Sequence, residues 1–119
     1  MEDICKIKDV LFFIYSFENT FSKEAGITLN EALILCKLKD GKSYSASEIA
    51  DFIGLTTSRV SRIISGFETK GMISRTIGNS DKRQMFFELT KEGKQLVKKM
   101  QNKQASIQDL SKKITDILA

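Results

Sequence analysis

Apolar residues recur at helical spacing along most of the chain, and the first such stretch is apolar on nearly every side. It covers residues 4–22, and its apolar members are Ile4, Ile7, Val10, Leu11, Phe12, Phe13, Ile14, Tyr15, Phe17 and Phe21. A domain of this size can bury one face of such a helix, but hardly two or three. The helix is therefore either the centre of the core or shared between two subunits. We favour the shared helix, because it lies at a chain end and the other helices have apolar faces of their own.

The next two helices are predicted from capping boxes, in which Ser or Thr caps a helix and Glu follows three residues later. Thr28 and Glu31 begin a helix that runs to about residue 39. Ser45 and Glu48 begin a shorter helix that runs to residue 53. Cys36 lies among apolar residues of the first of these two helices, so we expect an inert thiol in the core.

A further helix follows a short turn at Gly54 and has two contrasting faces. Its apolar residues have the i, i+3, i+4, i+7 spacing of one buried stripe: Val60, Ile63, Ile64 and Phe67. The other side and its flanks carry short hydroxyl side chains and arginine: Ser58, Arg59, Ser61, Arg62, Ser65 and Thr69. Small side chains let a backbone approach a surface closely, and the arginine fork fits guanine edges and phosphates. Lys70 and Gly71 end this helix, which with the one before it forms a helix-turn-helix.

Two β-compatible segments follow, 72–77 and 84–89, with a turn-rich tip at residues 78–83 between them. A helix suited to the major groove, followed by a basic hairpin, is typical of a winged helix-turn-helix. The alternative is an ordinary surface helix with a solvated hairpin. Gly66, inside the helix, costs about 1 kcal/mol relative to alanine, and either DNA or the hairpin could approach it closely.

Beyond the hairpin, residues 90–93 begin a long helical stretch with a narrow apolar stripe. The stripe has a heptad-like register: Met100, Ile107, Leu110, Ile114 and Ile117. Ser106 and Asp109 have the spacing of a new N-terminal cap, so we expect an interruption between residues 101 and 105. A stripe this narrow suits a seam with the N-terminal helix of the same chain or of a partner chain.

Positive charge is concentrated in one segment. All four arginines, Arg59, Arg62, Arg75 and Arg83, lie between residues 56 and 83, whereas lysines are spread along the chain. That segment contains six basic and two acidic residues, a balance of +4, which equals the formal charge of the whole protein. The rest of the chain is neutral, so the positive field lies where a polyanion such as DNA would bind.

The composition argues against an enzyme. Histidine is absent, which excludes histidine-based triads and the usual zinc sites. The two cysteines lack metal-ligand spacing, and no glycine-rich loop is placed to hold a phosphate. We therefore predict no cofactor and no metal. The acidic start lacks a secretory signal, and no apolar run could span a bilayer, so we predict a cytoplasmic protein without a membrane partner.

Two segments resemble the MarR family of transcriptional regulators, and the resemblance runs over residues 27–93: EIADFIGLTTSRVSRIISGFETKGMISR and SDKRQMFFELTKEG. The second is similar to the family's wing signature, an Asp-x-Arg at the tip followed by an alternating strand and Leu-Thr-x-x-Gly. The resemblance implies one mainly α domain of residues 1–119 with a small β-hairpin wing. Residues 27–93 would form the winged helix-turn-helix core, and residues 1–26 and 94–119 the dimerisation helices.

The resemblance also implies a homodimer that regulates transcription by binding a pseudo-palindromic operator in double-stranded DNA, most simply as a repressor. At the matching positions, the hydroxyl and arginine face would enter the major groove, Arg83 would enter the minor groove with Asp81 orienting it, and Arg75 would reach a phosphate. The complete predicted DNA-binding set is Thr56, Thr57, Ser58, Arg59, Ser61, Arg62, Ser65, Arg75, Asp81, Lys82 and Arg83.

Three departures and alternatives stay open. Both dimerisation arms are short for the family, which argues against the family's usual ligand cleft between the arms and the DNA-binding core. A small-molecule effector stays an alternative form of regulation. Leu11 stands where the peroxide-sensing branch has its reactive cysteine, so redox sensing through Cys5 is the less favoured form of regulation. A different class of function is a winged-helix protein-interaction module, using the Phe86 side of the hairpin and the aromatic N-terminal helix.

Overall fold

The computed structural model describes residues 1–78, 84–101 and 104–119, with side chains in the last segment described from residue 108 onward. Within these residues the elements are α1 (Glu2–Ala25), α2 (Leu29–Leu38), α3 (Ala46–Ile53), α4 (Thr57–Thr69), β1 (Ile73–Ile77), β2 (Met85–Leu89), α5 (Lys91–Gln101) and α6 (Gln104–Leu118). They form two compact units, one of residues 1–29 with 100–119 and the other of residues 30–99. Nearly all of the predicted wing tip, and the side chain of Ile107, lie outside the described residues.

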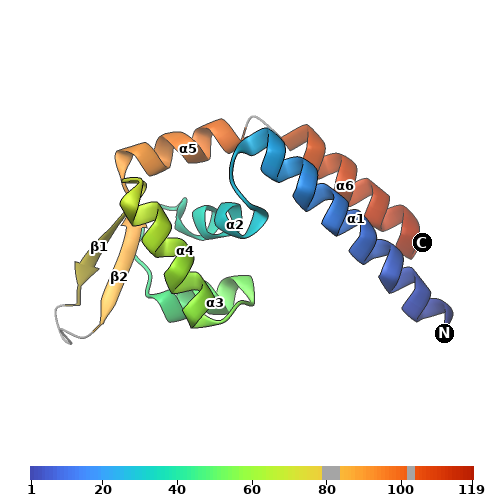
Figure 1. Ribbon diagram of the computed structural model, residues 1–119, viewed down its shortest axis with the longest axis horizontal. Coiled ribbons are helices and arrows are strands. Elements are labelled where there is room, and N and C mark those ends of the chain that lie inside the picture. The colour runs from blue at the N-terminus through green and yellow to red at the C-terminus, as the bar shows by residue number, and fades with distance from the viewer. Residues whose placement is uncertain (79–83, 102–103) are drawn as a thin grey trace. The chain divides into compact units, whose positions relative to one another are not determined.

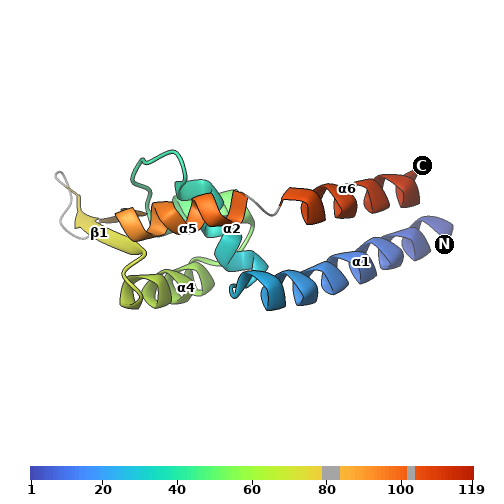
Figure 2. The ribbon, with the colours of Figure 1, turned by 90° about the horizontal axis from the view of Figure 1, so that it is seen from above.

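The first unit is built from α1 and α6, which pack side by side and run antiparallel in both views (Figures 1 and 2). The helix predicted at residues 4–22 is confirmed and is slightly longer at both ends, stopping at Gly26 in the left-handed conformation. Phe21 is its one buried residue. Its large exposed apolar residues are Ile4, Ile7, Leu11, Phe12 and Tyr15. Within a single chain, α1 is therefore not the centre of a core.

The second unit takes its fully buried side chains from α2, α3 and α4. They are Ile34, Leu35, Leu38, Ile49, Val60, Ile64 and Phe67. The prediction that Cys36 is a core thiol is wrong, because Cys36 is exposed. The buried stripe of α2 runs along Ile34, Leu35 and Leu38, and at about 100° per residue Cys36 points to the opposite side.

The capping box at the start of α3 is confirmed. The backbone N–H of Glu48 donates to Ser45 Oγ at 3.2 Å, and the backbone N–H of Ser45 donates to Glu48 Oε1 at 3.1 Å. Gly54 ends α3 with a φ of 83°, which forms the turn into α4. The α2 helix begins directly after Thr28, as predicted. Local sequence therefore determines where these helices begin.

The two strands predicted for the wing are confirmed, each one residue shorter at its start. They pair antiparallel, with Ile73 opposite Leu89 and Arg75 opposite Phe87. A bridge between Tyr44 and Phe87 adds a third short segment to the outer side of β2. Buried Ile73, Phe87 and Leu89 attach the hairpin to the core of the second unit.

The chain after the wing forms α5 and α6. The first ends at Gln101 and the second begins at Gln104, so both boundaries fall within the predicted interval of residues 101–105. The predicted N-terminal cap at Ser106 is wrong, since Ser106 already lies inside the first turn of α6. Gln104 and Ala105 are good helix formers, and they extend the helix ahead of that serine.

Candidate nucleic-acid interface

The α4 helix is positioned by a cap at its start and a buried stripe along one side. The backbone N–H of Arg59 donates to the Thr56 hydroxyl at 3.2 Å, so Thr56 is the N-terminal cap. Val60, Ile64 and Phe67 are buried, and Ile63 is partly buried. These contacts determine which side of α4 faces outward.

The outward side of α4 presents the predicted hydroxyl and arginine residues to solvent. All are exposed: Thr56, Thr57, Ser58, Arg59, Ser61, Arg62 and Ser65. In the described part of the chain, neither Arg59 nor Arg62 forms an ion pair or a side-chain hydrogen bond. Their guanidinium donors are therefore available to a partner.

Arg75 has a different environment from Arg59 and Arg62. Its Nε donates to Glu68 Oε2 and its Nη2 to Glu68 Oε1, both at 2.7 Å. The guanidinium holds the pKa of the Glu68 carboxyl below its ordinary value, so that carboxyl stays ionised. Sequence reasoning assigned Arg75 to a phosphate and missed Glu68. Glu68 is the acidic residue of the basic segment outside the wing tip, and that isolation is a signal that could have identified it.

Three predicted DNA contacts, Asp81, Lys82 and Arg83, lie outside the described residues. The described part of the wing consists of the strand pair and its ends. Phe86, expected on an exposed side of the hairpin, is only partly exposed. The exposed apolar side chains of the wing strands are instead Ile77 and Met85.

A hollow of about 290 Å³ separates α4 from the wing strands. It is lined by Ala46, Ser61, Ile64, Ser65, Glu68, Arg75, Met85 and Phe87. Three predicted contact residues, Ser61, Ser65 and Arg75, therefore border one concave surface.

Comparison with known proteins identifies the family. A family model described as "MarR family" matches residues 27–85, about half of the 119 residues. This chain belongs to the MarR family of transcriptional regulators. A comparison with curated proteins returned no match.

Several solved structures share the fold of this chain. A MarR mutant from E. coli, solved in complex with operator DNA, aligns with a TM-score of 0.82 at 18% identity, covering 94% of this chain and 84% of that one. YusO from Bacillus subtilis aligns with a TM-score of 0.69 at 26% identity, covering 92% and 78% of the two chains. BpsR from Bordetella bronchiseptica, whose DNA binding is regulated by 6-hydroxynicotinic acid, aligns with a TM-score of 0.73 at 16% identity, covering 91% and 83%.

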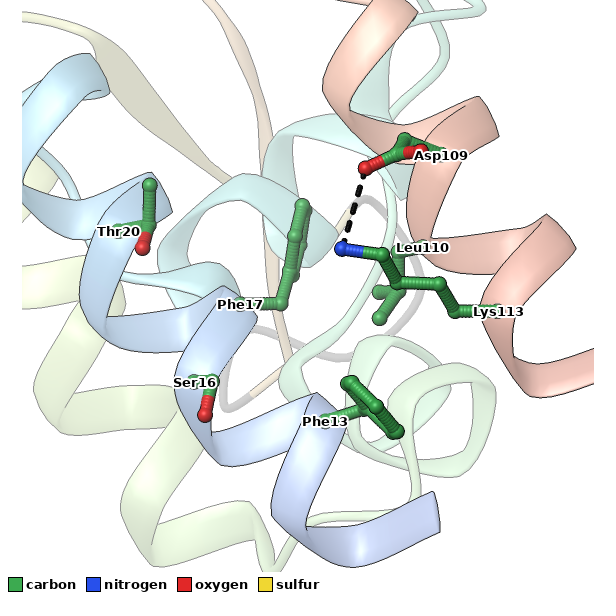
Figure 3. A pocket seen from close by; sticks show the side chains of 7 residues that line it. All are labelled: Phe13, Ser16, Phe17, Thr20, Asp109, Leu110 and Lys113. Atoms are coloured by element: carbon green, nitrogen blue, oxygen red, sulfur yellow. Dashed lines mark ion pairs between the residues drawn. The ribbon is translucent and has the colours of Figure 1, made fainter. Parts of the chain in front are cut away.

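This MarR-family chain has a second hollow, of about 210 Å³, between α1 and α6 of the first unit (Figure 3). It is lined by Phe13, Ser16, Phe17, Thr20, Asp109, Leu110 and Lys113. Lys113 Nζ lies 3.4 Å from Asp109 Oδ2, and 5.9 Å from the ring centroid of Phe13. The hollow therefore has aromatic walls and an ion pair at one edge.

Other kinds of site find no support in the described residues. No group of three or more Cys, Asp or Glu residues is placed there to hold a metal ion. Both cysteines, Cys5 and Cys36, are exposed and free. No helix in the described ranges has the length and apolar character that crossing a bilayer requires.

Proposed function

We propose that this protein is a dimeric, sequence-specific regulator that binds double-stranded DNA and represses transcription by occupying an operator. The observation that carries the proposal is the outward side of α4. Arg59 and Arg62 lie exposed and unpaired within the described residues, among short hydroxyl side chains, in the segment that holds the whole net charge of the protein. Arginine donors of this kind read guanine edges, and small neighbours allow a close approach.

In the proposed complex, α4 of each subunit enters a major groove, with the two helices about 34 Å apart, one helical turn of DNA. Base contacts from Ser58, Arg59 and Arg62 select the sequence, and phosphate contacts set the register. In this proposal Lys82 and Arg83, which lie outside the described residues, also contact DNA, with Arg83 in the minor groove and Asp81 orienting it. With about four or five phosphate contacts per subunit, log K falls with log salt at a slope of about −7 to −9.

A second copy of the chain is the proposed occupant of the exposed apolar side of α1. Phe12 and Tyr15 are 64% and 62% exposed, which is unusual for aromatic side chains without a partner. The hollow between α1 and α6 is about 210 Å³, smaller than the roughly 300–1,000 Å³ of most ligand pockets, and fits a side chain better than a drug-sized ligand. A small-molecule effector stays a prediction.

Dimerisation is tested by sedimentation of the wild-type protein, Phe12→Glu and the control Asn19→Glu. Both variants place a carboxylate on an exposed position of α1, but only the first replaces an apolar residue. We expect Phe12→Glu to sediment as a monomer and Asn19→Glu as a dimer. A monomeric wild type would contradict the proposal.

DNA binding is tested by selecting bound duplexes from a random pool. We expect a sequence with twofold symmetry and half-sites about 10 base pairs apart, as the geometry of a paired helix-turn-helix requires. Recovery of no enriched sequence, or a salt-insensitive interaction, would contradict the proposal and favour the protein-interaction module.

We also propose that the protein is located in the cytoplasm, as the sequence predicts.

A further inference from the structure

The ion pair between Glu68 and Arg75 connects the last turn of α4 to the first strand of the wing. Two nitrogens of one guanidinium donate to the two oxygens of one carboxylate, both at 2.7 Å. This fork fixes orientation as well as distance, because both groups are planar and the two hydrogen bonds are parallel. The pair spans the turn at Gly71, where φ is 75° and the chain reverses from helix to strand.

The same guanidinium also contacts the second strand of the wing. Arg75 Nη1 lies 3.1 Å from Met85 Sδ, and its Cζ lies 5.6 Å from the ring centroid of Phe87. Phe87 is the cross-strand partner of Arg75 in the hairpin. One side chain therefore links α4 to both strands of the wing, at the wall of the hollow between them.

The charges at this place oppose a simple phosphate contact. Glu68 takes the Nε and Nη2 side of the guanidinium and Met85 Sδ lies 3.1 Å from Nη1, so a phosphate would meet a guanidinium whose charge is already balanced by a carboxylate. An ionised carboxylate beside the proposed DNA path would repel phosphates if its partner turned away. Pairing neutralises Glu68 and holds Arg75, so both residues are satisfied without DNA.

We propose that Glu68 and Arg75 are positioning residues, which hold the wing strands at the angle to α4 that lets helix and hairpin enter adjacent grooves of one operator. This inference rests on the proposed function. Surface ion pairs contribute little to folding stability, so the role of the pair lies in geometry. The side chains of Arg75 and Glu68 are 46% and 22% exposed, so the pair is in part screened by solvent.

Glu68→Gln distinguishes the positioning role from a phosphate contact, because the two roles predict changes of opposite sign in operator affinity. If Arg75 contacts phosphate, Glu68→Gln frees the guanidinium and removes a negative charge, so operator binding tightens. If the pair positions the wing, the same substitution loosens the wing and weakens binding. Arg75→Lys adds a second test, because lysine keeps the charge but cannot form the fork.

The experiment measures operator affinity by fluorescence anisotropy over a series of salt concentrations. The proteins are the wild type, Glu68→Gln, Arg75→Lys, Arg75→Met, the double variant Glu68→Gln/Arg75→Met and the control Glu88→Gln. Glu88 lies on β2 and accepts a hydrogen bond from Ser43, so its variant makes the same charge change away from Arg75. Circular dichroism confirms that each variant is folded.

We expect each single variant of the pair to bind the operator about tenfold more weakly, which corresponds to about 1.4 kcal/mol. The double variant should bind no more weakly than the weaker single variant, because both substitutions break the same link. Glu88→Gln should bind within about twofold of the wild type. Glu68→Gln binding as tightly as the wild type, Arg75→Lys retaining full affinity, or additive losses in the double variant would each overturn the inference. A wild type that binds no duplex overturns the proposed function as well, so the two failures are distinguishable.

Discussion

A β carbon placed on Gly93 would lie 2.2 Å from the carbonyl oxygen of Met72. The two residues are brought together by Thr90, whose hydroxyl donates to the carbonyl oxygen of Gly71 at 2.6 Å and accepts from the backbone N–H of Gly93 at 3.1 Å. The backbone N–H of Thr90 also donates to Met72 O at 3.0 Å. The first turn of α5 is thereby attached to the turn that joins α4 to the wing. The Leu-Thr-x-x-Gly pattern of residues 89–93 thus has a structural explanation.

Gly93→Ala is expected to destabilise the protein. The new methyl group meets a backbone carbonyl, which cannot rotate away as a side chain would, so α5 must move from the α4–wing turn. Overpacking of this kind costs about 1–3 kcal/mol. Urea denaturation followed by circular dichroism measures the change in the free energy of unfolding. An alanine variant as stable as the wild type would contradict the close contact.

Gly66→Ala, the same substitution inside α4, is expected to have the opposite effect. A β carbon on Gly66 meets no described atom within 4 Å, which excludes close approach of the described wing residues as the reason for this glycine. Alanine in an exposed helix interior should stabilise the protein by about 1 kcal/mol. The same denaturation experiment measures it, with Gly93→Ala as the matched comparison. Weaker operator binding by this more stable variant would identify DNA as what approaches Gly66.

Arg62→Ala is expected to relax sequence preference. An arginine fork to a base edge contributes about 1–3 kcal/mol of discrimination. The difference in binding free energy between operator and mismatched duplexes should therefore decrease by that amount. Anisotropy titrations with both duplexes measure this difference. Lys94→Ala, which removes one positive charge from the exposed surface of α5, is the control and should leave the difference unchanged. Equal discrimination by Arg62→Ala and the wild type would remove Arg62 from the recognition surface.

The contact between Asp40 and Tyr44 predicts a pH-dependent contribution to stability. The Tyr44 hydroxyl donates to the Asp40 carboxylate and, with the backbone N–H of Lys42, holds the pKa of that carboxyl below its ordinary value of 3.8. The unfolded state therefore takes up the proton first as the pH falls. The stabilisation is complete above pH 3.8 and is lost as the pH falls through the lower folded-state pKa.

Tyr44→Phe tests this contribution, since phenylalanine keeps the ring beneath Lys37, whose Nζ lies 4.2 Å from the ring centroid. We expect the variant to melt below the wild type at neutral pH, with the difference shrinking under acid conditions. Thr69→Val is the control, because the Thr69 hydroxyl donates to the backbone carbonyl of Ser65, which does not titrate. A difference in melting temperature between Tyr44→Phe and the wild type that stays the same in acid would contradict the proposed role of the Asp40–Tyr44 contact.

Local patterns were sufficient to predict the helices, the hairpin and the outward side of α4. Capping residues such as Ser45 and Thr56 act within one turn of their own helix. The apolar stripe through Val60 and Phe67 indicates which side of α4 is buried, whichever element packs against it. The burial predicted for Cys36 is wrong because apolar residues surround it in the sequence on both sides, and this does not determine which side of α2 faces the core. Ser106 was mispredicted because helix ends depend on small energy differences over a few residues.

The amino-acid sequence by itself determined the order of elements and the concentration of arginine on one helix and one hairpin, since both follow from short-range chemistry. Among the described arginines, only the tertiary structure decided that Arg75 is paired and that Arg59 and Arg62 are not. Glu68 and Arg75 meet because a glycine turn folds a strand back beside the end of a helix, and Gly93 meets Met72 because Thr90 attaches the next helix to that turn. Such contacts depend on the angles between elements, and those angles are set by packing of the whole core.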